Sequence, residues 1–287
     1  SMINPSYYVP LARTAEEVGF DAIALADSIC YPEQSDSKYP YTPDGNREFL
    51  EKKPFLEPLT LIAALSSVTS RIEFLTSVLK LPIRHPVVLG KQVTSVAVLS
   101  NDRLQLGVGS SPWPDDYETV GLPWQGRGRR FDECIEILRG LATGHYFSYD
   151  GQCYQVPSIK LNPPPTRPIP ILIGGQSDAN LRRAARIGDG WISAGSTTEQ
   201  LADWIRTLRQ LRRDHRRDES SFAIHATTPD SFSMDGVRHL EEMGVTHTGG
   251  GFSSFNPYQV ELDSEPLDAK VAALQYYAET VIGPTRA

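Results

Sequence analysis

The sequence predicts an α/β protein, a single (β/α)8 TIM barrel with insertion loops, formed as one domain by residues 1–287. Short apolar runs, typical of buried parallel strands, alternate with segments whose apolar residues recur at helical spacing. The alternation continues along the whole chain. A length of 287 residues with 40% hydrophobic residues also suits one barrel domain.

In the first half of the chain each helix is followed by a strand. Apolar residues recur at helical spacing from Pro5 to Val18 and stop at Gly19, a residue type that commonly ends helices. The same criteria predict strands over 21–26, 72–79 and 104–108, and helices over 57–68, 86–99 and 127–142. A barrel begins with a strand, and residues 1–4 are too short for one, so we expect the first barrel strand to be missing from this sequence.

The second half repeats this order with shorter segments. Gly188 is placed to cap a helix just before the strand that starts at Gly190. Predicted strands cover 169–173, 190–194, 222–227 and 246–251, and predicted helices cover 179–187, 198–216, 235–242 and 266–281. Seven strands alternating with eight helices favour a closed barrel over an open sheet.

Two predicted connections, 28–55 and 146–167, are far longer than the usual loops of such a domain. The first follows a strand directly and therefore lies on the C-terminal face, where barrel enzymes place their sites. Its residues Tyr31, Tyr39 and Tyr41 could close over a substrate as a lid. The alternatives are a subunit contact or an ordinary surface loop.

Composition excludes several partners. The net charge of −7 provides no basic patch for nucleic acid. Three cysteines, Cys30, Cys134 and Cys153, lack the spacing of a metal site and are an odd number for a disulfide framework, so we expect no metal and a cytoplasmic location. No apolar run is long enough to cross a membrane.

Small and polar residues gather where the predicted strands end, which is typical of a floor for a large flat ligand. These ends are Asp27-Ser28, Ser77-Val78-Leu79, Gly109-Ser110-Ser111, Gly174-Gly175-Gln176-Ser177, Ala194-Gly195-Ser196 and Thr227-Thr228. The Gly174–Ser177 segment also opens a helix, whose N-terminus can bind a phosphate. The alternative is that small residues simply suit tight turns.

Motifs of other enzyme classes are absent from the sequence: there is no HExxH, no P-loop, and no GxGxxG between a strand and a helix. Of the six histidines, His85 and His225 are the candidates for a role in the site. A structural histidine is the alternative in each case.

Several motifs in register resemble the luciferase-like monooxygenase superfamily over nearly the whole chain. They are residues 15–21 (AEEVGFD), 84–86 (RHP), 99–103, 106–109 (LGVG), 127–140 and 188–191 (GDGW). Within that superfamily, residues 76–79 (TSVL) resemble the third-strand segment of the deazaflavin-dependent sugar-phosphate dehydrogenases, which use coenzyme F420. The resemblance implies a cis peptide bond between Ser77 and Val78.

The same resemblance implies a homodimer, a small-molecule substrate and hydride transfer with coenzyme F420, or alternatively an FMN-dependent monooxygenase. A non-catalytic barrel is a third possibility. The residues that it implies for the cofactor site are Asp27, Ser77, Val78, Ser110, Ser111, Gly174, Gly175, Gln176, Ser177, Ala194, Gly195 and Ser196.

The chain departs from the sugar-phosphate dehydrogenases at two positions. Ser28 stands where they carry a catalytic histidine, and Pro112 stands where they carry a glutamate, so the resemblance argues against glucose 6-phosphate as the substrate. The predicted catalytic residues are Ser28, Trp113 and His225. Further candidates for the proton donor are Asp115, Asp116 and Glu118.

Overall fold

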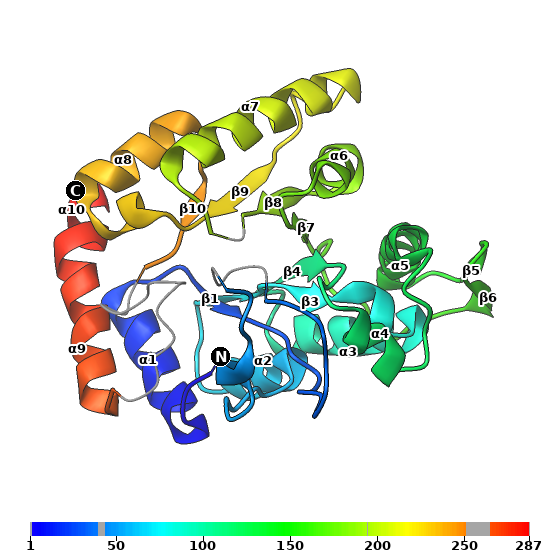
Figure 1. Ribbon diagram of the computed structural model, residues 1–287, viewed down its shortest axis with the longest axis horizontal. Helices are drawn as coiled ribbons and strands as arrows, with labels where there is room; N and C mark the ends of the chain where they lie inside the picture. Colours follow the sequence, from blue (N-terminus) through cyan, green and yellow to red (C-terminus); the bar gives the residue numbers. More distant parts are fainter. Residues whose placement is uncertain (1, 40–43, 194, 251–264, 287) are drawn as a thin grey trace. The chain divides into compact units, whose positions relative to one another are not determined.

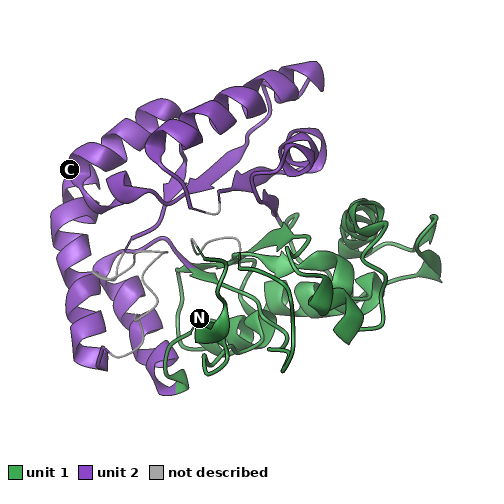
Figure 2. Ribbon diagram, in the orientation of Figure 1, with its two compact units in different colours: residues 1–5, 24–169 green, residues 6–23, 170–287 purple. Residues whose placement is uncertain are grey.

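The computed structural model describes residues 2–39, 44–193, 195–250 and 265–286. The chain forms two compact units, shown in different colours in Figure 2. The first unit comprises Ser1–Pro5 and Ala24–Ile169, and the second comprises Ser6–Ile23 and Pro170–Ala287. Each unit is therefore built from two separate segments of the chain. The single domain over 1–287 stays a prediction.

The first unit contains parallel strands and the helices that connect them (Figure 1). β4 (Leu104–Gly109) pairs in parallel with β2 (Glu73–Thr76) and with β3 (Leu79–Lys80). β1 (Ala22–Leu25), whose last two residues belong to this unit, lies beside β2. The helices are α2 (Pro58–Ser66), α3 (Pro86–Leu99), α4 (Pro114–Thr119) and α5 (Arg127–Ala142), with 3-10 turns η2 (Glu48–Leu50) and η3 (Leu81–Ile83).

The predicted strand over 72–79 is divided into β2 and β3 at a cis peptide bond between Ser77 and Val78, which confirms the bond that the resemblance implied. Val78 passes directly over Gly109 of β4. A Cβ atom at position 109 would lie 2.5 Å from Cγ2 of Val78, so only glycine fits there. The Ser77 N–H donates a 2.7 Å hydrogen bond to the carbonyl of Leu25, which ties this bend to β1.

The predicted loop over 146–167 contains an antiparallel hairpin of β5 (Phe147–Asp150) and β6 (Gln155–Ile159). Glu133, buried on α5, fixes the turn of this hairpin. Its carboxylate accepts hydrogen bonds from the backbone N–H groups of Gln152, Cys153 and Tyr154 at 2.9–3.2 Å.

The second unit contains four parallel strands in sequence order: β7 (Ile171–Gly174), β8 (Gly190–Ile192), β9 (Ala223–Ala226) and β10 (His247–Thr248). Its helices are α1 (Tyr8–Val18), α6 (Asp178–Ile187), α7 (Thr198–Asp214), α8 (Met234–Met243), α9 (Leu267–Tyr277) and α10 (Gly283–Arg286). Shorter turns are η1 (Pro5–Tyr7) at the junction with the first unit, η4 (Pro229–Phe232), and the π-helical η5 (Ala278–Ile282). α6 packs against α7, and α1 packs against α9 (Figure 1).

The N-terminal helix is attached to the C-terminal end of the chain within the second unit. Gly19 ends α1 in the left-handed conformation with φ +100°, as its position in the sequence predicts. Just beyond it, Phe20 stacks on Tyr277 of α9 with ring centroids 5.6 Å apart, and Asp21 pairs with Arg286 at 2.6 Å. The segment 6–23 is therefore part of the core of this unit.

The predicted helices and strands lie close to the observed ones, and the α/β class is confirmed in both units. The last predicted strand, 246–251, is observed over His247–Thr248, and its final residue lies outside the described residues. Among the described helices, none combines the length and the apolar character needed to cross a bilayer.

Candidate active site

In the first unit, Asp27 follows β1, is buried, and forms an ion pair with Arg84. Arg84 holds both of its carboxylate oxygens, with Nη1–Oδ2 at 2.7 Å and Nη2–Oδ1 at 2.9 Å, and the backbone N–H of Lys80 donates to Oδ2 at 2.9 Å. Asp27 was predicted to bind a cofactor. Its carboxylate instead binds Arg84 and the backbone of Lys80, and so connects the ends of β1 and β3.

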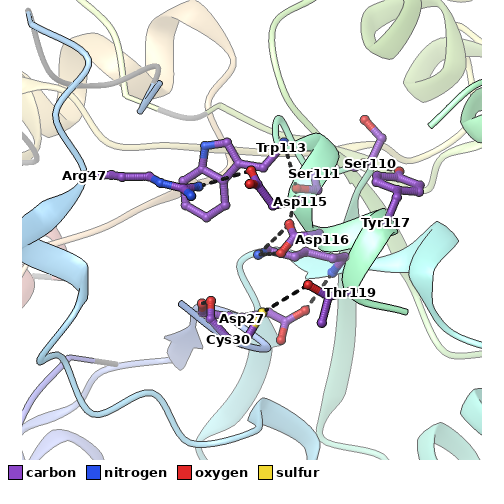
Figure 3. A network of polar contacts seen from close by, with 12 residues as sticks. Asp27, Cys30, Arg47, Ser110, Ser111, Trp113, Asp115, Asp116, Tyr117 and Thr119 are labelled. Atoms are coloured by element: carbon purple, nitrogen blue, oxygen red, sulfur yellow. Dashed lines mark hydrogen bonds and ion pairs between the residues drawn. The ribbon is translucent and has the colours of Figure 1, made fainter. Parts of the chain in front are cut away.

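A second buried ion pair lies beside it, in the network drawn in Figure 3. Lys80 Nζ is 2.8 Å from Oδ2 and 3.0 Å from Oδ1 of Asp116. The Ser111 hydroxyl donates to the same carboxylate, and Lys80 Nζ lies 4.8 Å from the centre of the Trp113 ring. Asp116, a proton-donor candidate by sequence, is therefore buried on α4 and charge-paired.

Four half-buried residues follow the carboxyl ends of β2 and β4: Ser77 and Val78 after β2, and Ser110 and Ser111 after β4. The carbonyl of Ser110 accepts from the Tyr117 hydroxyl, and Ser111 adopts a positive φ of 58° that turns the chain into α4. Val78, packed over Gly109, provides an apolar surface with hydroxyl groups on its flank.

A pocket of about 180 Å³ opens in the first unit beside Ser28. Its apolar walls are Tyr31, Leu50, Phe55 and Trp113, and its polar lining includes Ser28, Cys30, Arg47 and Lys53. The structure thus brings two predicted catalytic residues, Ser28 and Trp113, to one pocket, together with Tyr31 of the predicted lid.

Trp113 forms a wall of this pocket and is no free proton donor. Its indole Nε1 donates to the carbonyl of Lys38 at 3.1 Å, and its ring packs against Tyr39 with centroids 6.0 Å apart. The Ser28 hydroxyl makes a long contact of 3.4 Å with the carbonyl of Cys30. Tyr41 of the predicted lid lies outside the described residues.

Arg47 extends between Trp113 and Asp115, as Figure 3 shows. Its Nη1 lies 3.4 Å from Oδ2 of Asp115. Burial raises the pKa of Asp115, but hydrogen bonds from Ser35 and Ser37 and the charge of Arg47 outweigh that effect and lower it. Asp115 is therefore ionised and already has several partners. Glu118, the remaining proton-donor candidate, is exposed.

In the second unit, the Gly174–Ser177 segment connects β7 to α6, as predicted. Gly175 has φ +105°, and its carbonyl accepts from Trp191 Nε1 at 2.8 Å. The Gln176 side chain donates to the carbonyl of Gly195 at 2.8 Å, and Ser177 caps α6. Gly174 is the buried last residue of β7, and Ala194 lies outside the described residues.

Near β8 and β9, three buried polar atoms have no hydrogen-bond partner among the described residues: the hydroxyls of Ser193 and Ser196, which follow β8, and Nε2 of His225, within β9. The His225 ring stacks on His247, with centroids 4.1 Å apart and an interplanar angle of 5°. Burial, assisted by His247, lowers the pKa of His225 to about 3, so the imidazole is neutral near pH 7. His225, the third predicted catalytic residue, belongs to this unit and not to the pocket beside Ser28.

Each unit, taken by itself, contains features that suit a ligand. In the first unit, Val78 over Gly109 forms an apolar surface of the kind that supports a ring, and Ser110 directly follows Gly109. In the second unit, the unpaired hydroxyls of Ser193 and Ser196 and the N-terminus of α6 can bind oxygen-rich groups. Among the described residues, no group of three or more His, Cys, Asp or Glu side chains could hold a metal ion.

Sequence reasoning missed Arg47 and Lys80. Arg47 lies in a long polar loop, where nothing distinguishes it from its neighbours. Lys80, by contrast, is the one charged residue in 74–83 and directly follows a predicted strand, and an isolated charge at that place was a usable signal. His85 is structural: its Nδ1 accepts the N–H of Val87 at 3.3 Å and caps α3.

The chain belongs to the luciferase-like monooxygenase family, whose sequence profile matches residues 1–235. A Mycobacterium tuberculosis protein of uncharacterized function is 50% identical over 282 residues, which cover 98% of this chain and 96% of that protein. An F420-dependent glucose-6-phosphate dehydrogenase of Nakamurella multipartita is 29% identical over 217 residues, covering 74% of this chain and 58% of the dehydrogenase.

Two solved structures show the same fold. A monooxygenase from Streptomyces bottropensis has a TM-score of 0.77 at 17% identity, with 100% of this chain and 97% of that one covered. The coenzyme F420-dependent tetrahydromethanopterin reductase of Methanopyrus kandleri has a TM-score of 0.75 at 13% identity, covering 99% and 96%. The fold is thus α/β and TIM-barrel-like, and the family is one of oxidoreductases.

Proposed function

We propose that this protein is a coenzyme F420-dependent oxidoreductase that transfers hydride to or from a small organic substrate. The observation that carries the choice of cofactor is the 29% identity with an F420-dependent dehydrogenase over 74% of the chain. The Streptomyces monooxygenase, at 17% identity, shares the fold alone.

In this proposal, the ring of the cofactor contacts Val78 and the segments around Ser77 and Ser110, all of which belong to the first unit. A bound deazaflavin carries hydride at a ring carbon and, unlike a flavin, reacts poorly with oxygen. The protein itself contributes binding, orientation and proton handling.

His225 is the residue that we assign to proton handling. Its neutral imidazole has a buried nitrogen without a partner, which can accept a hydrogen bond from a hydroxyl group or donate one to a carbonyl oxygen. Ser28 is the hydrogen-bonding group that we assign to the pocket of the first unit, and Trp113 forms its wall.

Glucose 6-phosphate is not the substrate that we propose, because Ser28 and Pro112 replace the histidine and glutamate of the sugar-phosphate dehydrogenases. A homodimer in the cytoplasm remains part of the proposal.

The test is a fluorescence titration of the purified protein with coenzyme F420 and, separately, with FMN. We expect quenching of the F420 emission at micromolar protein and a weaker effect with FMN. In a Gly109→Val variant the new side chain clashes with Val78, so the F420 signal should be abolished. Val88→Ala, which shortens an exposed side chain on α3, should change the signal little.

The second candidate is an FMN-dependent monooxygenase, which membership in the luciferase-like monooxygenase family favours. Preferential binding of FMN, followed by oxygen consumption when the flavin is reduced, would replace the first proposal with this one. Binding of neither cofactor would support a barrel without catalytic activity.

A further inference from the structure

We propose that the pocket beside Ser28 binds the carboxylate of a small organic acid with an apolar body, and that Arg47 is its anchor. The inference rests on the proposed function, because it treats the organic acid as the substrate of the proposed oxidoreductase. Acid binding at Arg47 can be measured without the cofactor.

Arg47 is the first reason. Only 7% of the residue is exposed, and its buried Nη2 has no hydrogen-bond partner in the part of the chain that the structure describes, although the residue lines the pocket. Buried guanidinium groups are normally paired, and a carboxylate matches their planar fork with two parallel hydrogen bonds. The protein therefore holds a carboxylate-binding group whose hydrogen-bonding capacity is only partly used.

Asp115 occupies only part of the hydrogen-bonding capacity of the Arg47 guanidinium. It contacts Nη1 alone, at 3.4 Å, a distance beyond the usual range of a charge-assisted hydrogen bond. Its carboxylate also accepts hydrogen bonds from Ser35 and Ser37. Asp115 thus orients the guanidinium from one side and leaves the Nη2 side for another acceptor.

Aromatic rings hold the guanidinium in this position. Its central carbon lies 5.1 Å from the centre of the Trp113 ring and 5.7 Å from that of Tyr31. Such cation–π contacts position an arginine without consuming its N–H groups. The same two rings line the pocket, so the cation lies beside an apolar wall.

The walls and the volume define the rest of the ligand. Trp113, Tyr31, Phe55 and Leu50 suit a flat apolar body, and a cavity of about 150 Å³ is enough to hold benzene, close to the 180 Å³ observed. The charged lining residues are Arg47, Lys53 and the exposed Glu51, so two of the three are cationic. A free inorganic anion would leave the apolar walls without a partner.

The test is calorimetric titration of the full chain with benzoate, with benzyl alcohol as its neutral counterpart, and with inorganic phosphate. Each titration is run with and without coenzyme F420. We expect benzoate to bind at least about tenfold more tightly than benzyl alcohol, because only the acid satisfies Arg47. Arg47→Gln should weaken benzoate binding by about 10- to 100-fold and leave benzyl alcohol unchanged.

Two further variants make the result interpretable. Arg47→Lys keeps the charge but loses the planar fork, so its affinity for benzoate should be intermediate. Arg206→Gln removes an exposed guanidinium on α7 and should bind benzoate like the wild type. Circular dichroism establishes that each variant is folded, and Arg47→Lys carries the test should Arg47→Gln not fold.

Equal affinity for benzoate in the wild type and in both Arg47 variants would overturn the proposal. So would Arg47-dependent binding of phosphate that is tighter than that of benzoate. Arg47-dependent benzoate binding in a protein that binds no F420 would support the acid site and reject the proposed cofactor, whereas F420 binding without benzoate binding would do the reverse.

Discussion

At the scale of single residues, Lys80 illustrates how a charge is kept inside the first unit. Its ammonium group has Asp116 as ion partner and Trp113 as a nearby ring, and both members of the pair are almost completely buried. Removing one member of such a pair lowers the free energy of unfolding by more than the intact pair contributes to it, because the other charge is left buried without a partner.

We therefore expect Asp116→Ala to lower the free energy of unfolding by about 3 to 5 kcal/mol, as is usual when a buried pair loses one partner. Urea denaturation measures the change. Asp115→Ala, which removes a longer and more exposed contact to Arg47, should cost clearly less. The double variant Lys80→Met/Asp116→Ala should recover most of the lost free energy of unfolding. If the changes in the two single variants simply add up in the double variant, the pairing is contradicted.

His225 makes stability depend on pH. Its folded-state pKa of about 3 lies below its ordinary value of 6.5, so between these values the unfolded chain binds more protons at this residue than the folded chain does. Stability contributed by the neutral imidazole is thus present above pH 6.5 and is lost as the pH falls toward 3, by up to about 1.4 kcal/mol per pH unit.

The matched comparison is between the wild type and His225→Gln, unfolded in urea at a series of pH values. From about pH 7.5 to about pH 5, we expect the wild type to lose about 2 kcal/mol more than the variant does, because glutamine does not titrate. Parallel stability curves for the two proteins would show that His225 titrates normally and would remove the basis for its proposed role.

At the scale of elements, the sequence patterns located most helices and strands because periodicity and capping residues are local signals. The hairpin of β5 and β6 was missed because it lies in a Pro-rich connection and its strands are largely exposed. α4 was missed because a six-residue helix is too short to show a period. Neither element carries the apolar pattern on which the prediction depends.

The candidate site was predictable only in part, for a similar reason. Strand ends could be located, so Ser28 was found, and the resemblance to the sugar-phosphate dehydrogenases indicated the bend at Ser77-Val78. The partners of Asp27 and Arg47 depend on contacts between residues distant in sequence, Arg84 and Trp113 among them, and no local pattern specifies those contacts.

The β5–β6 hairpin depends on one side chain. Glu133 accepts four hydrogen bonds from three consecutive backbone N–H groups, all in the turn at residues 152–154. Replacement by glutamine halves the acceptor capacity and removes the charge. We expect Glu133→Gln to cost about 2 kcal/mol, since hydrogen bonds to a charged group contribute more than neutral ones.

Hydrogen exchange provides a local measurement of this effect. The amides of residues 152–154 should exchange at least about tenfold faster in Glu133→Gln, because their shared acceptor is weakened. Glu136→Gln on the same helix is the control, since Glu136 accepts a hydrogen bond from the Tyr149 hydroxyl and not from the turn at residues 152–154. Unchanged protection in Glu133→Gln would mean that the hairpin is held by its apolar contacts with Ile137 and Leu141 instead.

At the scale of the whole molecule, the two units are discontinuous in sequence. The segment 6–23 precedes most of the first unit but belongs to the second, where α1 packs against α9. Buried residues on α1 include Leu11, Ala12 and Ala15. A fragment that contains only the C-terminal segment would therefore expose the apolar surface that α1 covers.

We accordingly expect the fragment 170–287, produced alone, to lack a cooperative unfolding transition by circular dichroism, whereas the full chain unfolds cooperatively. A permuted fragment, in which a flexible linker joins residue 287 to residue 6 and the chain ends at residue 23, restores α1 together with Phe20, the partner of Tyr277. It should regain a transition and protect the amides of α9 from exchange. Cooperative folding of 170–287 without α1 would contradict the division, because it would show that the N-terminal helix is not part of the second unit's core.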